Sequence, residues 1–102
     1  MIDMTGQNLL VVEDEYFIAY ELSQSLSKHG AHVVGPFMDL EEASKALRKT
    51  AVTGAILDVN LQGQRVYDLA DELVARHIPF VFASGYSQSD LPERFHGIPL
   101  CE

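Results

Sequence analysis

The chain has 102 residues, of which 47% are hydrophobic and 22% charged, and its formal net charge at pH 7 is -8. That length and composition predict one globular domain with a single core. The acidic balance argues against direct binding to nucleic acid or to an anionic membrane, because such binding needs clustered Lys and Arg. No apolar run approaches the roughly 20 residues that a membrane-spanning helix requires.

A lone cysteine, Cys101, rules out an internal disulfide and suits a reducing compartment. Residues 1–8 lack the basic and apolar regions of a secretory signal, so a cytoplasmic location is expected. The four histidines show no spacing typical of zinc ligands and have no cysteine pair beside them. The sequence therefore predicts a cytoplasmic domain without a zinc site.

Residues 8–30 predict a strand followed by a helix. The apolar run 8–12 has the pattern of a buried strand, and it stops at the three carboxylates of residues 13–15. Beyond them, apolar side chains recur at i, i+4 and i+8, namely Ile18, Leu22 and Leu26. We expect this stripe, with Phe17 and Ala19 beside it, to face the core.

Residues 31–35 predict a second strand, which the dipeptide Gly35-Pro36 should end. Asp39 and Glu42 have the spacing of a capping box, although Asp replaces the usual Ser or Thr. The helix that they open carries four apolar residues on one face, namely Leu40, Ala43, Ala46 and Leu47.

The stretch 54–61 is the centre of the chain. A short apolar run ends abruptly in the carboxylate of Asp58, and the sequence turns polar from Asn60 onward. A buried parallel strand has this pattern. In open α/β sheets the chemistry lies just beyond the carboxyl ends of such strands. Asp58 is therefore the first candidate site residue.

Residues 64–77 have the clearest amphipathic pattern of the chain. Apolar side chains fall at i, i+3, i+4, i+7 and i+8, namely Val66, Leu69, Ala70, Leu73 and Val74. Pro79 should end this helix, because proline cannot continue the hydrogen-bond ladder. Residues 80–83 predict a fourth strand, a short helix is expected near Pro92, and residues 98–101 predict a fifth strand.

Strands and helices alternate along the chain in the order β-α-β-α-β-α-β-(α)-β. This alternation implies right-handed crossovers and a parallel sheet with helices on both faces, an α/β fold. In that topology the ends of the first and third strands lie side by side. The carboxylates of Glu13, Asp14 and Asp58 should therefore converge.

The convergence of Glu13, Asp14 and Asp58 predicts a Mg²⁺ site. Carboxylates at close range raise one another's pKa unless a cation lies between them, and oxygen ligands suit Mg²⁺. The backbone carbonyl of Asn60 is a further candidate ligand. The alternative for Glu13, Asp14 and Glu15 is the ordinary preference of carboxylates for the first turn of a helix.

Asp58 is also a candidate nucleophile, because a carboxylate can accept a phosphoryl group as an aspartyl phosphate. Ser84, just past the fourth strand, is a candidate hydroxyl donor to a phosphoryl oxygen. Ala83 or Gly85 is a candidate for supplying a backbone N–H. An ordinary strand-to-loop turn is the alternative for Ser84 and Gly85.

Three segments resemble the motifs of response-regulator receiver domains: residues 9–15 (LLVVEDE), 56–61 (ILDVNL) and 82–86 (FASGY). The similarity covers nearly the whole chain, and both the order and the spacing of the motifs agree. It implies one receiver domain over residues 1–102. The implied fold is flavodoxin-like (CheY-like), a doubly wound five-stranded parallel sheet with helices on both faces.

The resemblance also implies roles for the candidate residues. Asp58 would be the phosphoacceptor, and Glu13 and Asp14 the acidic pair. Asp14, Asp58 and the carbonyl of Asn60 would hold Mg²⁺, and Ser84 would be the switch hydroxyl. A sensor histidine kinase or a histidine phosphotransfer protein would dock near the first helix and supply the phosphoryl group. The downstream partner is not identified, and a homodimer is left open.

Residues 79–86 (PFVFASGY) are similar to the "FAT GUY" subgroup of receivers, whose members are often single-domain regulators in bacterial phosphorelays. Two features depart from the family pattern. Receivers usually carry Lys-Pro just after the fifth strand, and that pair would follow Glu102, so the chain is expected to be truncated there. The fifth strand also contains no switch aromatic, and Tyr86 is a candidate for that role.

Two alternatives belong to other classes of protein. A phosphatase of the haloacid-dehalogenase type also uses a strand-end Asp and Mg²⁺, but it needs a second Asp where this chain has Asn60. A pseudo-receiver would act through protein contacts alone, and the intact acidic set argues against it. The reading favoured by the sequence is a signalling module, not a metabolic enzyme.

Overall fold

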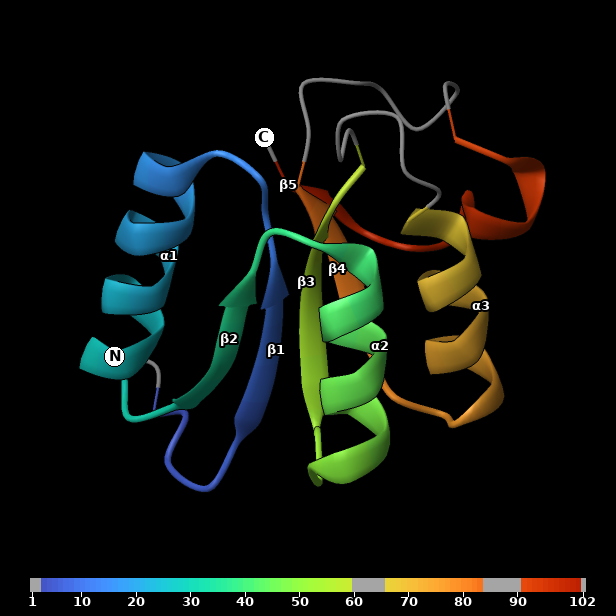
Figure 1. The fold of residues 1–102 in the computed structure, drawn as a ribbon. Helices are drawn as coiled ribbons and strands as arrows, with labels where there is room; N and C mark the ends of the chain where they lie inside the picture. The colour runs from blue at the N-terminus through green and yellow to red at the C-terminus, as the bar shows by residue number, and fades with distance from the viewer. Residues whose placement is uncertain (1–2, 60–65, 84–90, 102) are drawn as a thin grey trace.

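The computed structural model describes residues 3–59, 66–83 and 91–101. They form a parallel sheet of five strands in the order β2-β1-β3-β4-β5 (Figure 1). The strands are β1 (Asn8–Val12), β2 (His32–Phe37), β3 (Gly54–Asp58), β4 (Phe80–Ala83) and β5 (Leu100–Cys101). The helices are α1 (Tyr16–Lys28), α2 (Leu40–Lys49), α3 (Val66–Ala75) and a 3₁₀ helix (Glu93–Phe95). The predicted α/β class, the five parallel strands and the adjacency of the first and third strands are confirmed.

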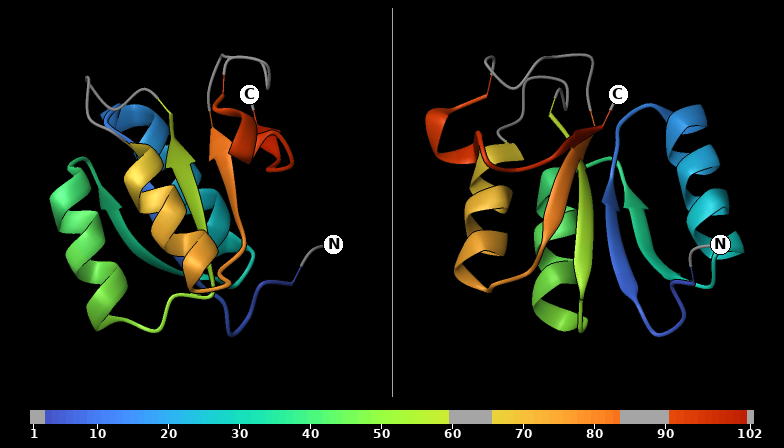
Figure 2. Two further views of the ribbon diagram at one scale, coloured as in Figure 1. Left: turned by 90° about the vertical axis from the view of Figure 1, so that its right-hand side faces the viewer. Right: turned by 180° about the vertical axis from the view of Figure 1, so that it is seen from behind.

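The helices cover both faces of the sheet. The helix α2 lies in front of the sheet in Figure 1 and behind it in the right-hand view of Figure 2. Successive side chains of a strand point to opposite faces. Accordingly, Leu10 and Val12 of β1 belong to the larger core under α2 and α3, whereas Val11 packs with Leu26 under α1.

The core-facing side of α1 differs from the predicted one. Ala19 and Leu26 are buried, but Ile18 is exposed and Phe17 is 72% exposed. The prediction that Ile18 and Phe17 face the core is therefore wrong. The stripe through Ala19, Leu22 and Leu26 has i, i+3 and i+7 spacing, which fits the helical period as well as the predicted stripe does. Val74, at the end of the predicted stripe of α3, is likewise exposed.

The strand β2 does not end at Gly35-Pro36 as predicted. It continues to Phe37, with an irregularity in its pairing between Leu10 and Val12 of β1. Gly35 has φ of 111°, and an added Cβ would lie 2.8 Å from the Phe37 nitrogen. A residue without a side chain is needed for this backbone path. The extension brings the Phe37 carbonyl within 2.9 Å of the Glu13 N–H, which donates a hydrogen bond to it.

The other boundaries lie close to the predicted ones. The helix α3 ends at Ala75, before Pro79, and His77 beyond it adopts the left-handed backbone region with φ of 58°. The short helix expected near Pro92 is the 3₁₀ helix, and β5 is shorter than predicted. Within the described residues, no helix combines the length and the apolar character needed to cross a membrane.

The N-terminus of α2 provides a direct test of local structure. The Asp39 carboxylate accepts hydrogen bonds from the Glu41 and Glu42 N–H groups, at 2.6 and 3.4 Å. Asp39→Ala removes this cap and is expected to lower the free energy of unfolding by about 1 kcal/mol. Asp39→Asn keeps an acceptor oxygen and should cost clearly less. Urea unfolding followed by circular dichroism measures both, and equal losses would contradict the capping role.

Candidate functional site

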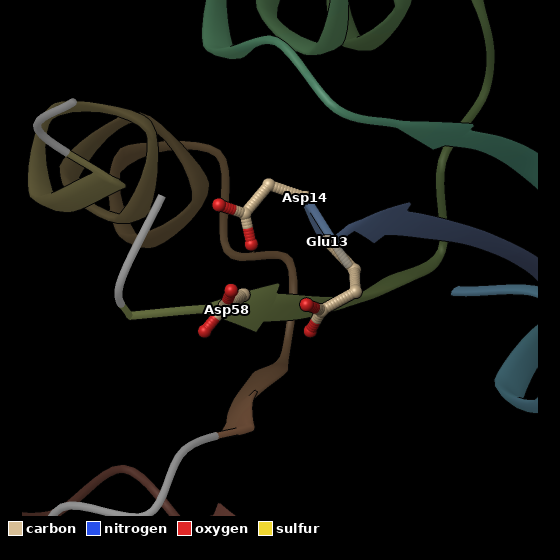
Figure 3. A group of neighbouring side chains, drawn as sticks. All are labelled: Glu13, Asp14 and Asp58. Atoms are coloured by element: carbon tan, nitrogen blue, oxygen red, sulfur yellow. The ribbon is translucent and has the colours of Figure 1, made fainter. Parts of the chain in front are cut away.

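The carboxyl ends of β1 and β3 lie side by side at one edge of the sheet. Val12 pairs with Leu57 in the parallel register, so the residues that follow, Glu13 and Asp58, come next to each other. Figure 3 shows the side chains of Glu13, Asp14 and Asp58 gathered at this edge. The expected convergence of the three carboxylates is present in the structure.

The three carboxylates form a tight group. One oxygen from each lies within 4.8 Å of the other two. Glu13 is only 5% exposed and Asp58 is 9% exposed, while Asp14 is half-buried. Three acidic groups held this closely and partly away from water repel one another, and a cation between them would relieve the repulsion.

Glu13 is the most buried of the three, and its backbone and its side chain each make a hydrogen bond. Its backbone N–H donates to the Phe37 carbonyl, and its Oε1 accepts a hydrogen bond from the Glu15 N–H at 3.0 Å. Burial raises the pKa of the Glu13 carboxyl, and the charges of Asp14 and Glu15 add to this rise. The hydrogen bonds that Glu13 makes with the Glu15 backbone and with the Asp58 side chain oppose the rise.

The donor set fits a hard divalent cation. Carboxylate oxygens are the ligands that Mg²⁺ and Ca²⁺ prefer, and neither Cys nor His contributes to the described group. Three carboxylates supply fewer oxygens than the six that Mg²⁺ binds, so water or a phosphate oxygen would fill the remaining positions. The arrangement therefore suits a cation that binds a few protein oxygens and keeps part of its coordination for a ligand.

Of the other candidate residues, Ala83 is the one the structure places. It ends β4 and pairs in register with Asp58, and the Val59 N–H donates to its carbonyl at 3.4 Å. Ala83 thus lies beside Asp58 on the neighbouring strand. Asn60, Ser84, Gly85 and Tyr86 lie outside the described residues, and their roles stay predictions.

The sequence did not indicate the part played by Phe37. The Phe37 carbonyl accepts a hydrogen bond from the Glu13 N–H, and this contact depends on β2 continuing past Gly35-Pro36. A Gly-Pro dipeptide commonly ends a strand. Only the backbone conformation of Gly35 could therefore have shown that β2 continues to Phe37.

Comparisons with known proteins place this chain in one family. Two solution structures of SdrG resemble the chain. One is of SdrG from Sphingomonas melonis Fr1, with 36% identity, a TM-score of 0.82 and coverage of 98% of this chain and 85% of that one. The other is of a BeF3-activated conformation of SdrG, described as from Pseudomonas melonis Fr1, with 37% identity, a TM-score of 0.78 and coverage of 98% and 84%.

A third similar structure is the response regulator PhyR from Brucella abortus, with 26% identity and a TM-score of 0.75 over 83% of this chain and 35% of that one. Among curated proteins, the transcriptional regulatory protein PdtaR from Mycobacterium tuberculosis is 32% identical over 89 residues. Those residues make up 86% of this chain, which spans 43% of the length of PdtaR. No protein-family model matches the chain.

The fold is of the doubly wound α/β class, with a group of carboxylates at the carboxyl ends of β1 and β3. The chain belongs to the response-regulator receiver domains. The "FAT GUY" subgroup rests largely on residues 84–86, and that assignment stays a prediction.

The raised pKa of Glu13 predicts how stability depends on pH. A carboxyl group whose pKa is higher in the folded than in the unfolded protein destabilises the folded state when it is charged. The free energy of unfolding therefore falls as the pH rises above the ordinary pKa of 4.5. Glu13→Gln is therefore expected to raise the melting temperature by a few degrees at pH 7 in EDTA. The gain should shrink towards pH 4, where Glu13 is largely protonated.

Thermal unfolding followed by circular dichroism at the two pH values checks this expectation. Glu21→Gln, on the exposed side of α1, is the matched control and should change the melting temperature little at either pH. A melting temperature of Glu13→Gln at or below that of the unmodified protein at pH 7 would show that the buried charge is not destabilising.

Proposed function

We propose that the chain is a phosphoacceptor receiver domain, in which Asp58 takes a phosphoryl group from a phosphohistidine donor and thereby changes a protein-interaction surface. One observation carries the proposal. Asp58 stands at the carboxyl end of a central strand, 9% exposed and within 4.8 Å of two further carboxylates. That is the edge at which ligands bind in open α/β sheets.

The proposed step is a simple transfer between two nucleophiles. A carboxylate oxygen of Asp58 attacks phosphorus, the P–N bond of the phosphohistidine breaks, and the imidazole nitrogen leaves with the bonding electron pair. The product is a mixed acid anhydride on Asp58, whose phosphoryl group carries about 1.5 to 2 negative charges in place of the single charge of the free carboxylate. Catalysis of such a transfer consists mainly of positioning and charge neutralisation.

Mg²⁺ is the cofactor proposed for this site. Asp14 and Asp58, supported by the buried Glu13 and by the Asn60 backbone carbonyl, are the groups that would hold it. When bound, Mg²⁺ would neutralise charge on the carboxylates and on the phosphoryl oxygens. The close approach of the described carboxylates supports this assignment, because it is otherwise unfavourable.

The remaining contacts to the phosphoryl group are proposed from the residues that follow β4, the strand beside Asp58. Ala83, which pairs with Asp58, ends the strand that leads to Ser84 and Gly85. Ser84 would donate its hydroxyl to a phosphoryl oxygen, and a backbone N–H at Ala83 or Gly85 would donate to another. Tyr86 is proposed as the accompanying switch aromatic.

The partner proposed to supply the phosphoryl group is a histidine kinase or a histidine phosphotransfer protein in the cytoplasm. The first two turns of α1, directly after the acidic edge, expose Tyr16, Phe17, Ile18 and Tyr20. Such a group of exposed apolar side chains marks a protein-interaction surface. A donor docked there would place its phosphohistidine next to Asp58.

The similarity to SdrG supports phosphorylation as the activating event. A BeF3-activated conformation of SdrG has been solved, and that protein is 37% identical to this chain. Beryllofluoride has the shape and charge of a phosphoryl group bound to a carboxylate. A pseudo-receiver would neither take up phosphate nor respond to beryllofluoride, and a phosphatase of the haloacid-dehalogenase type would turn over a phosphate ester.

Phosphate incorporation from acetyl phosphate tests the assignment of Asp58. With Mg²⁺ the unmodified chain should take up one hydroxylamine-sensitive phosphate, and EDTA should abolish the uptake. Asp58→Ala should lose incorporation entirely, because the substitution removes the carboxylate oxygen that attacks phosphorus. Asp68→Ala, which removes an exposed aspartate of α3, is the control and should retain it. Incorporation retained in Asp58→Ala would sink the proposal.

The exposed rings of α1 allow the docking surface to be tested separately from the chemistry. Phe17→Ala should slow transfer from a histidine kinase that phosphorylates the unmodified chain by roughly tenfold, because exposed aromatic anchors dominate interface energies. Uptake from acetyl phosphate, which needs no docking surface, should stay within about twofold.

Val74→Ala removes an exposed apolar side chain from α3 and should affect neither rate. If Phe17→Ala slows both donors equally, the role of Phe17 lies in the site or in stability and not in docking.

A further inference from the structure

The strand β2 carries one residue more than β1 close to the acidic edge. Val12 pairs with Phe37 beyond a shift in the register of the two strands. Val11 therefore faces two residues of β2, Gly35 and Pro36, which is the arrangement of a β-bulge. Bulges are rare between parallel strands and are over-represented next to functional sites, where they redirect the backbone that follows.

The first position of this bulge requires glycine. Gly35 has φ of 111°, a backbone conformation that residues with a side chain adopt only with strain. An added Cβ would lie 2.8 Å from the Phe37 nitrogen, 2.9 Å from the Phe37 ring and 3.0 Å from the Val11 carbonyl oxygen. Two of these three atoms belong to the backbone, so they cannot rotate away as a side chain could. A side chain at residue 35 would therefore displace Phe37, the neighbouring part of β1, or both.

Phe37 connects the bulge to the acidic edge. Its ring packs against the larger core, and its carbonyl accepts a hydrogen bond from the Glu13 N–H at 2.9 Å. The Oε1 atom of Glu13 in turn accepts a hydrogen bond from the Glu15 N–H at 3.0 Å. The backbone before Asp14 is thus held by Phe37, and the backbone after it is held by the Glu13 carboxylate.

These two contacts determine where the Asp14 carboxylate lies. One of its oxygens is within 4.8 Å of oxygens of Glu13 and Asp58. Mg²⁺ requires a nearly ideal octahedral arrangement of its ligands and tolerates little displacement of any of them. A small shift of the backbone around Asp14 would therefore weaken the binding of this cation.

We propose that Gly35 is a positioning residue for a cation at the acidic edge. The bulge that Gly35 permits places Asp14, through the Phe37 carbonyl and the Glu13 backbone, and thereby sets the affinity of the edge for Mg²⁺. The inference rests on the proposed function, because it needs a cation at this edge. Gly35 is exposed and is not among the grouped carboxylates, so it acts on the cation through the backbone.

A purely structural role for Gly35 has a different consequence. Substitution would then lower the free energy of unfolding without changing how tightly the folded protein binds Mg²⁺. Residues that orient metal ligands contribute about 10- to 100-fold to metal affinity. Because Gly35 acts through one further residue, Phe37, a loss of about tenfold, at the lower end of that range, is expected for Gly35→Ala.

The test uses the full chain with Mg²⁺ alone as the probe, and it follows the backbone amides by NMR. In the unmodified protein, Mg²⁺ should shift the amides of Asp14 and Val59. In Gly35→Ala the dissociation constant for Mg²⁺, measured from the same shifts, should rise about tenfold. The Glu13 amide should also exchange with solvent faster than in the unmodified protein, because its hydrogen bond to Phe37 is weakened.

Gly30→Ala is the matched control. Gly30 also has a positive φ, of 98°, and an added Cβ would lie 2.7 Å from Thr5 Oγ1. Gly30 precedes β2 and so lies at the opposite end of this strand from Phe37. The substitution should lower the free energy of unfolding, as Gly35→Ala does. It should leave the dissociation constant for Mg²⁺ within about twofold, because distant sites act independently.

A measurement on the unmodified protein covers the case in which Gly35→Ala does not fold. By thermodynamic linkage, a hydrogen bond that favours Mg²⁺ binding must itself be strengthened by Mg²⁺. The scalar coupling across the hydrogen bond from the Glu13 N–H to the Phe37 carbonyl should therefore increase in magnitude as Mg²⁺ is added. An unchanged coupling at saturating Mg²⁺ would overturn the inference.

Unchanged Mg²⁺ affinity in folded Gly35→Ala would also overturn the inference, as would an equal loss of affinity in Gly30→Ala. In each of these cases the proposed function stands, because the unmodified chain still binds the cation. If Mg²⁺ does not bind the unmodified chain at all, both the inference and the proposed cofactor fall.

Discussion

The parallel pairing of β1 with β3 is the constraint on which the site depends. Because Val12 lies opposite Leu57, the two strands end together, and the residues that follow bring carboxylates from different parts of the chain to one edge. A slip of one residue in this register would turn Asp58 to the other face and break up the group. The apolar side chains of β1 and β3, buried on both faces, oppose such a slip, so the packing of the core also positions the chemistry.

This positioning has an energetic cost that the surrounding backbone reduces. Glu13 is buried among like charges, and hydrogen bonds at its backbone and its side chain hold it there. One of them comes from the extension of β2 through Gly35, a conformation that a residue with a side chain would strain. An irregular strand far from Asp58 in sequence thus supports the acidic edge. Under the proposed function, this loss of stability would accompany the ability to bind a cation and a phosphoryl group.

Much of the fold was predictable, because buried parallel strands and amphipathic helices leave clear periodic patterns. Asp58 was identified for the same reason: it is the first charged residue after an apolar run. The buried side of α1 was not predictable, since stripes through Ile18 and through Ala19 fit the helical period equally well. Phe95 was also missed. It lies in a segment that looked polar, and its partner Tyr67 is 28 residues away, so nothing in local spacing connects the two rings. Such contacts follow from tertiary packing alone.

The exposed rings at the start of α1 lie next to the acidic edge of a chain with a net charge of -8. The two features respond differently to ionic strength. Anions approaching the edge from solution meet a long-range repulsion that salt screens, whereas apolar contact with the rings is short-ranged and largely insensitive to low concentrations of salt. Adding salt would therefore speed the approach of a small anionic phosphate donor more than the docking of a protein donor on the rings. Under the proposed function, the relative access of the two kinds of donor to Asp58 would thus depend on the ionic strength of the medium.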